Sequence, residues 1–248
     1  MKLLFTGLLC MVFTTASFAS DGDYAVSKIP AELLINADAV KRIETIRFEL
    51  SDVDHARYYS KVAYTILNEK GDRFAGCLES YDKLHSIESM DGRLFDANGK
   101  KIKSVKRSEI SDKSGTDEGT LADDSRYKYH NFYYKVYPYT VEYEIEVRYY
   151  YTMFYPGWVP LKDEHLSVEK GSITVSMPSG MDFRYKSFNF KDQPSIQKDK
   201  SGTSYSWNLV NHPALVSEPY APSWYEMTPV VCLAPVQFAV QGYKGNMA

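Results

Sequence analysis

The sequence has few of the residues that build metal centres and covalent catalytic sites. Its 248 residues include 3 cysteines and 5 histidines, and no two histidines stand two or four positions apart. It contains no Gly-x-Ser-x-Gly elbow, no phosphate-binding loop and no dinucleotide fingerprint. These local patterns therefore predict no catalytic residue, no metal ligand and no bound cofactor.

Long apolar runs are missing beyond the N-terminus, so no transmembrane segment is predicted in the rest of the chain. At the N-terminus, Lys2 precedes an apolar run at residues 3–13, and residues 17–19 read Ser-Phe-Ala. A positive start, an apolar run too short to span a bilayer and small residues before a cut are typical of a signal peptide. We therefore expect residues 1–19 to be removed from an exported, periplasmic or extracellular, bacterial-type protein. The alternatives are an N-terminal anchor or a buried helix.

The chain also lacks a strong excess of either charge. Its formal charge is −3, and loss of residues 1–19 removes Lys2 and makes the charge −4. A mildly acidic chain with interspersed signs is a poor partner for nucleic acid, so no nucleic-acid binding is expected. The basic stretch at residues 100–107 is interpreted as a solvated strand face.

Loss of the signal peptide leaves two cysteines, Cys77 and Cys232, which fit no metal-binding spacing. They could form a disulfide in an oxidising compartment, or they could be two separate buried thiols. Both lie in strand-like sequence rather than at the start of a helix, where a nucleophilic thiolate is commonly stabilised. An independent cysteine hydrolase is therefore the least favoured hypothesis.

Aromatic residues are abundant, at 15% of the chain with 21 tyrosines. Tyrosine suits strands, because its ring covers a pleated surface while its hydroxyl reaches water or a partner. Much of the chain alternates apolar and polar residues with a period of two, which is typical of half-buried antiparallel strands. The clearest stretch predicts that Val141, Tyr143, Ile145, Val147 and Tyr149 point inward, and that Thr140, Glu142, Glu144, Glu146, Arg148 and Tyr150 point outward as a solvated polar face.

Turn signals separate these strands, among them Asp91-Gly92 and Asn98-Gly99, which tolerate the positive φ of tight hairpins. We predict an all-β fold, an antiparallel β-sandwich of roughly nine to twelve strands with one short N-terminal helix. Residues 20–39 are expected to form a leader and this helix, with its turn at residues 31–36. Residues 40–241 are expected to form one sandwich domain.

Three aromatic residues in proline-containing segments, Trp158, Trp224 and Tyr225, are candidates for ligand contact, because such rings stack on sugars. The alternative is that they plug the ends of the sandwich. Residues 111–125 are rich in acids, but their spacing does not match an EF-hand, so a solvated surface loop is expected. The acids of this loop are Asp112, Asp117, Glu118, Asp123 and Asp124.

Apolar residues crowd the C-terminal part of the chain, where a domain usually frays into polar sequence. They predict either a surface for a partner or a buried strand. These residues are Val230, Val231, Leu233, Val236, Phe238 and Val240.

A series of short phrases, spread over about residues 40–240, resembles domain of unknown function 3857. This domain stands at the N-terminus of secreted bacterial proteins whose next domain is a transglutaminase-like, cysteine protease-like core. The phrases are Ala63-Tyr64-Thr65-Ile66-Leu67-Asn68 with Gly71-Asp72, Phe95-Asp96-Ala97-Asn98-Gly99-Lys100, Tyr137-Pro138-Tyr139-Thr140-Val141-Glu142-Tyr143, Pro178-Ser179-Gly180, Tyr205-Ser206-Trp207, Pro213-Ala214-Leu215 and Glu218-Pro219.

The resemblance implies a β-sandwich accessory domain, with the catalytic Cys, His and Asp in the following domain. Residues 242–248 would then begin a linker to a C-terminal domain absent from this chain. The leading hypothesis is a non-catalytic accessory domain that packs against, or presents substrate to, that transglutaminase-like domain. The alternative is a free-standing β-sandwich module that binds glycan or peptide.

Overall fold

The computed structural model describes residues 23–115 and 124–247. The predicted signal peptide, and the loop acids Asp117, Glu118 and Asp123, lie outside the described residues. Across the described ranges, no helix is long and apolar enough to cross a membrane. The all-β prediction is confirmed, with 15 strands among the described residues rather than the expected nine to twelve.

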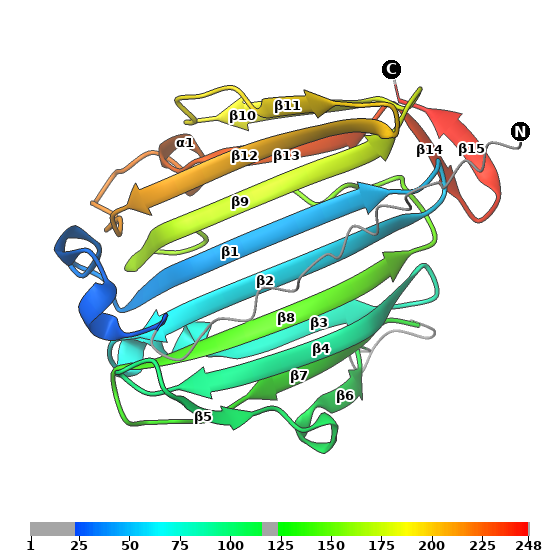
Figure 1. Cartoon of the computed structure of the whole chain (residues 1–248). Helices are drawn as coiled ribbons and strands as arrows, with labels where there is room; N and C mark the ends of the chain where they lie inside the picture. Colours follow the sequence, from blue (N-terminus) through cyan, green and yellow to red (C-terminus); the bar gives the residue numbers. More distant parts are fainter. Residues whose placement is uncertain (1–22, 116–123, 248) are drawn as a thin grey trace, which may run out of the picture.

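The main sheet has eight strands and is mixed rather than purely antiparallel (Figure 1). β1 and β9 run parallel, and the other neighbouring pairs in this sheet are antiparallel. In spatial order the strands are β11 (Ser195–Lys198), β12 (Gly202–His212), β9 (Leu166–Pro178), β1 (Ala39–Leu50), β2 (Ala56–Ile66), β8 (Tyr139–Tyr149), β4 (His85–Phe95) and β5 (Lys101–Ser104).

The parallel pair corrects the antiparallel prediction, and the path of the chain after β8 explains it. β8 and β9 both run in the direction of β1, so the chain must cross back between them, and the 16 residues 150–165 make this crossing. Parallel strands need such a connection of about a dozen residues or more, which is usually a helix. This connection contains no helix, so the sequence pattern gave no sign of a parallel pair.

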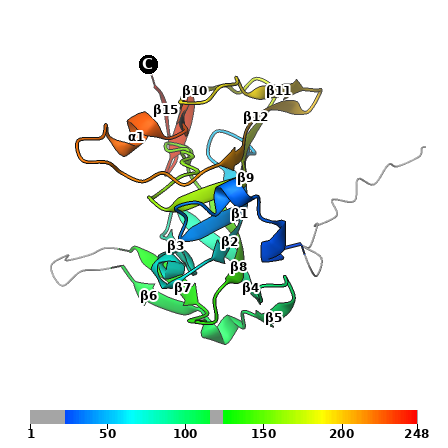
Figure 2. The same cartoon turned by 90° about the vertical axis from the view of Figure 1, so that its left-hand side faces the viewer.

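Two small sheets cover one face of the main sheet, which we call the covered face. One has the order β3 (Gly76–Tyr81), β7 (Arg126–Asn131) and β6 (Ser111–Ser114), and the other pairs β10 (Phe183–Phe188) with β13 (Val230–Pro235). Figure 2 views the main sheet along its edge and shows β3, β6, β7 and α1 on the side away from the N-terminal segment. The result is a sandwich with one large layer and one divided layer.

The divided layer produces two hydrophobic clusters. The first core cluster packs Cys77 of β3 against residues of β2, β4 and β8, including Val141 and Tyr143. The second core cluster packs Phe183 and Val231 of the β10–β13 sheet against residues of β1 and β9. All five residues predicted to point inward from β8 lie in or against the first cluster, so that prediction is confirmed.

The helical elements are short. They are the 3-10 turns η1 (Val26–Lys28), η2 (Ala31–Leu33), η3 (Glu69–Phe74) and η4 (Arg107–Glu109), and the α-helix α1 (Trp224–Met227). η2 is the predicted N-terminal helix, shorter than the expected residues 31–36. Ahead of it, Tyr24 is buried in the segment that the sequence suggested to be a loose leader.

Five of the six C-terminal apolar residues belong to strands, and Val236 lies in the bend between β13 and the next strand. Val230 and Val231 are buried in β13, so the alternative of a buried strand is correct for this part of the run. The chain then forms the hairpin of β14 (Gln237–Val240) and β15 (Tyr243–Asn246). Residues 243–246 are therefore a paired strand and not the beginning of a linker.

Candidate functional site

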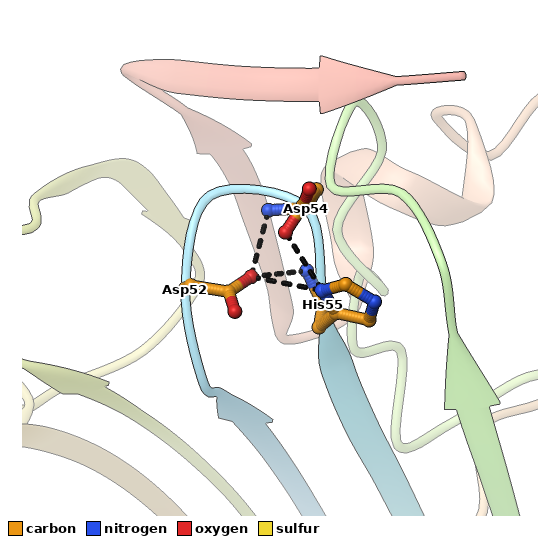
Figure 3. Close-up of side chains that lie close together, drawn as sticks. All are labelled: Asp52, Asp54 and His55. Atoms are coloured by element: carbon orange, nitrogen blue, oxygen red, sulfur yellow. Dashed lines mark hydrogen bonds and ion pairs between the residues drawn. The ribbon is translucent and has the colours of Figure 1, made fainter. Parts of the chain in front are cut away.

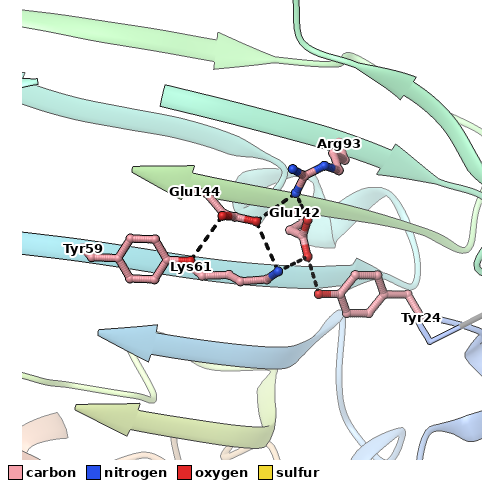
Figure 4. A network of polar contacts seen from close by, with 6 residues as sticks. All are labelled: Tyr24, Tyr59, Lys61, Arg93, Glu142 and Glu144. Carbon is pink, nitrogen blue, oxygen red and sulfur yellow. Dashed lines mark hydrogen bonds and ion pairs between the residues drawn. The ribbon is translucent and has the colours of Figure 1, made fainter. Parts of the chain in front are cut away.

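The face opposite the covered face, here called the outer face, carries a network of four charged side chains from three adjacent strands (Figure 4). Lys61 of β2 pairs in register with Glu144 of β8, and Arg93 of β4 pairs with Glu142. Arg93 Nη1 lies 2.5 Å from a Glu142 oxygen and 2.8 Å from Glu144 Oε1. Lys61 Nζ lies 3.1 Å from Glu142 and 3.2 Å from Glu144. Two carboxylates are thus matched by two cations.

Two tyrosine hydroxyls complete this network. Tyr24 donates to Glu142 Oε2 at 2.5 Å, and Tyr59 donates to Glu144 Oε2 at 3.2 Å. Burial, and then the negative charge of Glu142, raise the pKa of Tyr24, so its proton stays on the phenol. Arg42 also donates to the Tyr24 carbonyl at 3.2 Å. The network therefore holds the N-terminal segment against the sheet.

The prediction that Glu142 lies on a solvated face is wrong, because its exposed fraction is 0%. The Tyr24 segment covers this part of the outer face, where Tyr24 packs against Phe95 and Ala63. Burial would raise the pKa of Glu144, but hydrogen bonding to Arg93 and the charge of Lys61 outweigh it and lower that pKa. Acid–base catalysis by two carboxylates needs environments that keep one of them protonated. This balanced network instead stabilises the fold.

A second ionic cluster fixes the crossing segment on the covered face. The fully buried Lys41 places Nζ 2.8 Å from Glu44 Oε1 and 2.6 Å from the Pro160 carbonyl oxygen. Trp158 Nε1 donates to the other Glu44 oxygen at 2.8 Å. Burial lowers the pKa of Lys41, and the charge of Glu44 opposes this effect. Every group of the cluster has a partner, so it anchors residues 150–165 to β1.

This arrangement corrects the expectation for Trp158 as a ligand-contact residue. Its ring is only 1% exposed and belongs to the second core cluster. Trp224, in α1, is half-buried and donates from Nε1 to the Leu161 carbonyl at 2.7 Å. Tyr225 is 65% exposed. The three candidate aromatics therefore do not share one surface, and the alternative that they close the sandwich fits two of them.

Strand pairing brings together a cysteine and a histidine that the sequence did not connect. Cys77 of β3 lies directly opposite His130 of β7, and His130 Nδ1 is 2.8 Å from the Tyr143 hydroxyl. Burial, and then the charge of Glu79, raise the pKa of the Cys77 thiol to about 12. Burial lowers the pKa of His130. An activated nucleophile needs the opposite shift of the thiol pKa.

Cys232 lies on β13, is exposed, and is a free thiol like Cys77, so the two cysteines do not form the disulfide that the sequence allowed. Cys232 is also not the buried core residue that its apolar neighbours suggested. It points away from the second core cluster, into which the adjacent Val231 packs. The alternation of the strand sets this difference between neighbouring residues.

We expect a thiol reagent such as Ellman's reagent to label only Cys232 quickly in the native mature protein. Cys77 is buried and its thiolate form is disfavoured, so its labelling should require unfolding. Labelling is followed by absorbance at mildly alkaline pH, with and without denaturant. Cys232→Ser is the control and should abolish the fast phase. Fast labelling of Cys77 in that variant would contradict the buried, protonated thiol.

Asp52, Asp54 and His55 form an exposed group in the turn between β1 and β2 (Figure 3). Their potential ligand atoms lie within 4.8 Å of one another. Asp52 Oδ1 accepts the backbone N–H of Asp54 at 3.0 Å and that of His55 at 2.7 Å. Hydrogen bonding to Asp54 is the main cause that raises the pKa of His55. Aspartates commonly make such bonds to stabilise turns, and this turn chemistry accounts for the arrangement without a metal.

Comparison with known proteins identifies a family and a similar fold. The profile described as Domain of Unknown Function with solved structure, DUF3857, matches residues 53–216. No curated protein matches the sequence. Among solved structures, a candidate protease from Parabacteroides distasonis ATCC 8503 superposes with a TM-score of 0.68 at 13% identity. The match covers 80% of this chain and 40% of that chain, so this chain spans less than half of the protein it resembles.

Other solved structures align much less well. An M1 zinc metallopeptidase from Deinococcus radiodurans gives a TM-score of 0.34 at 7% identity, covering 80% of this chain and 42% of that chain. A candidate nutrient-binding protein from Legionella pneumophila gives a TM-score of 0.33 at 11% identity, covering 81% and 68%. At these scores, neither carries an argument about this chain.

Proposed function

The chain belongs to the DUF3857 family, and on that basis we propose that it is a non-catalytic N-terminal accessory module of an exported transglutaminase-like protein. In this proposal it packs against, or presents substrate to, a C-terminal catalytic module.

The observation that carries the proposal is the fold likeness to a candidate protease, of which the matching part is 40%. A protease more than twice as long as the matching part has room for a separate catalytic module. The thiol of Cys77 agrees with this division of labour. Its raised pKa and burial suit a core residue, although the register places His130 beside it.

The proposal predicts that the mature chain alone hydrolyses no peptide bond and transfers no acyl group. The measurement uses a fluorescent casein substrate for hydrolysis and a labelled primary amine for transfer. Cys77→Ser and His130→Ala serve as matched variants. Turnover by the wild-type chain that both substitutions abolish would overturn the non-catalytic role, because it would assign the chemistry to this pair.

The nucleotide sequence of the gene beyond codon 248 tests whether a partner module follows. We expect the reading frame to continue beyond codon 248 into a segment that contains the Cys, His and Asp of a transglutaminase-like domain. A stop codon directly after Ala248 would instead favour the free-standing binding module. The glycan form of that alternative has lost its main support, because Trp158 is buried and Trp224 half-buried.

A further inference from the structure

One edge of the main sheet is only partly paired. β4 pairs with β8 from His85 to Phe95, but β5 pairs with β4 only from Arg93 to Phe95. Along His85–Asp91, no other strand of the described residues pairs with β4 on the side away from β8. β6 is also an edge strand, because it pairs only with β7 in its sheet.

A groove of about 450 Å³ runs along this unpaired stretch. Five consecutive residues of β4, Ile87 to Asp91, form one of its sides, and Asp112 of β6 and Lys128 of β7 lie on the other. Ile87, Val105 and Ile110 also line it and pack against the first core cluster, to which Met90 belongs. The groove therefore combines an open strand edge with an apolar floor.

The backbone of β4 offers hydrogen-bonding groups to this groove. The N–H of Val105 donates to the Gly92 carbonyl at 2.8 Å, which shows that the backbone groups of Gly92 point away from β8. Backbone groups of alternate residues in a strand point to the same side, and the register is regular from Met90 to Gly92. The N–H and C=O of Met90 therefore point into the groove. A bulge between Ile87 and Ser89 limits regular pairing to the stretch from Ser89 onward.

Three acids and two cations line the groove, and they are Glu88, Asp91, Asp112, Arg107 and Lys128. Glu88 is paired with Arg148 at 3.0 Å, and Asp112 with Arg126 at 2.9 Å. Asp91 is exposed and has no ion-pair or hydrogen-bonding partner for its side chain among the residues described. A basic residue on an added strand, opposite Asp91 on the outer face, would supply the missing countercharge.

We infer that this groove receives an extended peptide segment of a partner chain, which adds to β4 as a new strand next to the end of β5. Apolar side chains of the peptide lie on Ile87, Met90 and Ile110, and a lysine or arginine pairs with Asp91. Strand addition obtains affinity from backbone hydrogen bonds and specificity from alternate side chains. This function goes beyond the accessory role proposed above and requires no following module.

The test is a titration of the mature chain with a fluorescein-labelled peptide of about seven residues that alternates valine and lysine. Fluorescence anisotropy is expected to show saturable binding. N-methylation of the alternate peptide amides that face β4 should abolish binding, whereas N-methylation of the other set should preserve it. The two methylation patterns give different results only if the peptide binds as a strand that has one edge paired with β4 and the other edge free.

Two protein variants test whether Asp91 pairs with a basic residue of the peptide. Asp91→Lys should weaken binding about tenfold, because an attractive cross-strand pair becomes a repulsive one. Glu32→Lys changes the net charge equally at an exposed position in η2 and should leave binding within about twofold. Equal loss in both variants, equal effects of both methylation patterns, or no saturable binding would overturn the inference. A concentration-dependent dimer that the peptide dissociates would assign the edge to a second copy and also overturn it.

Discussion

Lys61→Met is expected to lower the free energy of unfolding by about 3 kcal/mol. The substitution leaves two carboxylates, Glu142 and Glu144, with one cation between them, Arg93. Glu142 is fully buried, so its charge cannot be compensated by water. The effect falls at the low end of the range for breaking a buried ion pair, because Arg93 and Tyr24 still hydrogen-bond to Glu142. Urea denaturation followed by tryptophan fluorescence measures it.

Two further variants separate this network from ordinary surface charge. Arg57→Met removes a cation from the same strand and the same face, where Arg57 is exposed and lies 3.5 Å from Glu146, and should cost less than about 1 kcal/mol. The double variant Lys61→Met/Glu142→Gln restores the balance of charge and should be more stable than the sum of its single variants by about 1–3 kcal/mol. Equal effects of Lys61→Met and Arg57→Met would show that the network is solvated.

The period of two identified which residues of β8 share a face, but not what covers that face. The alternation correctly predicts that Val141, Tyr143 and Ile145 point inward, because apolar alternation reports burial directly. The same alternation wrongly predicts that Glu142 faces solvent, because its side chain is charged. Its burial depends on Tyr24, which is 118 residues away in the sequence and reaches it by tertiary packing. A charged residue is buried only when distant partners match it, and a local pattern cannot show those partners.

On the covered face, too, a local sequence pattern does not show the contacts between distant segments. The alternation of β3 and β7 is visible in the sequence, but the register that places Cys77 opposite His130 depends on how the two strands align. The groove beside β4 is hidden for a related reason. The turn Asn98-Gly99 predicts the hairpin of β4 and β5, yet only the structure shows that β5 pairs with three residues of β4 and leaves the rest of that edge open.

Val141→Asp is expected to have an effect at least as large as that of Lys61→Met. Val141 is 0% exposed and lies in the middle of the sheet, opposite Tyr64 on β2 and Leu94 on β4. Losing the apolar side chain costs about 1.5 kcal/mol or more, and burying a carboxyl without a partner adds about 2 kcal/mol or more. The sum, about 3.5 kcal/mol or more, is a large share of the stability of a typical domain, so the urea concentration at the midpoint of unfolding should fall well below that of the wild type.

The matched control for this prediction is Val210→Asp on β12, where the same substitution meets water. Val210 is 66% exposed and lies opposite Lys170 on β9, so the new carboxylate gains a cation and loses little burial. Its free energy of unfolding should stay within about 0.5 kcal/mol of the wild type. Circular dichroism and urea titration of both variants make the comparison. Similar destabilisation by the two would contradict the burial of Val141 and the exposure of Val210, because the chemical change is identical.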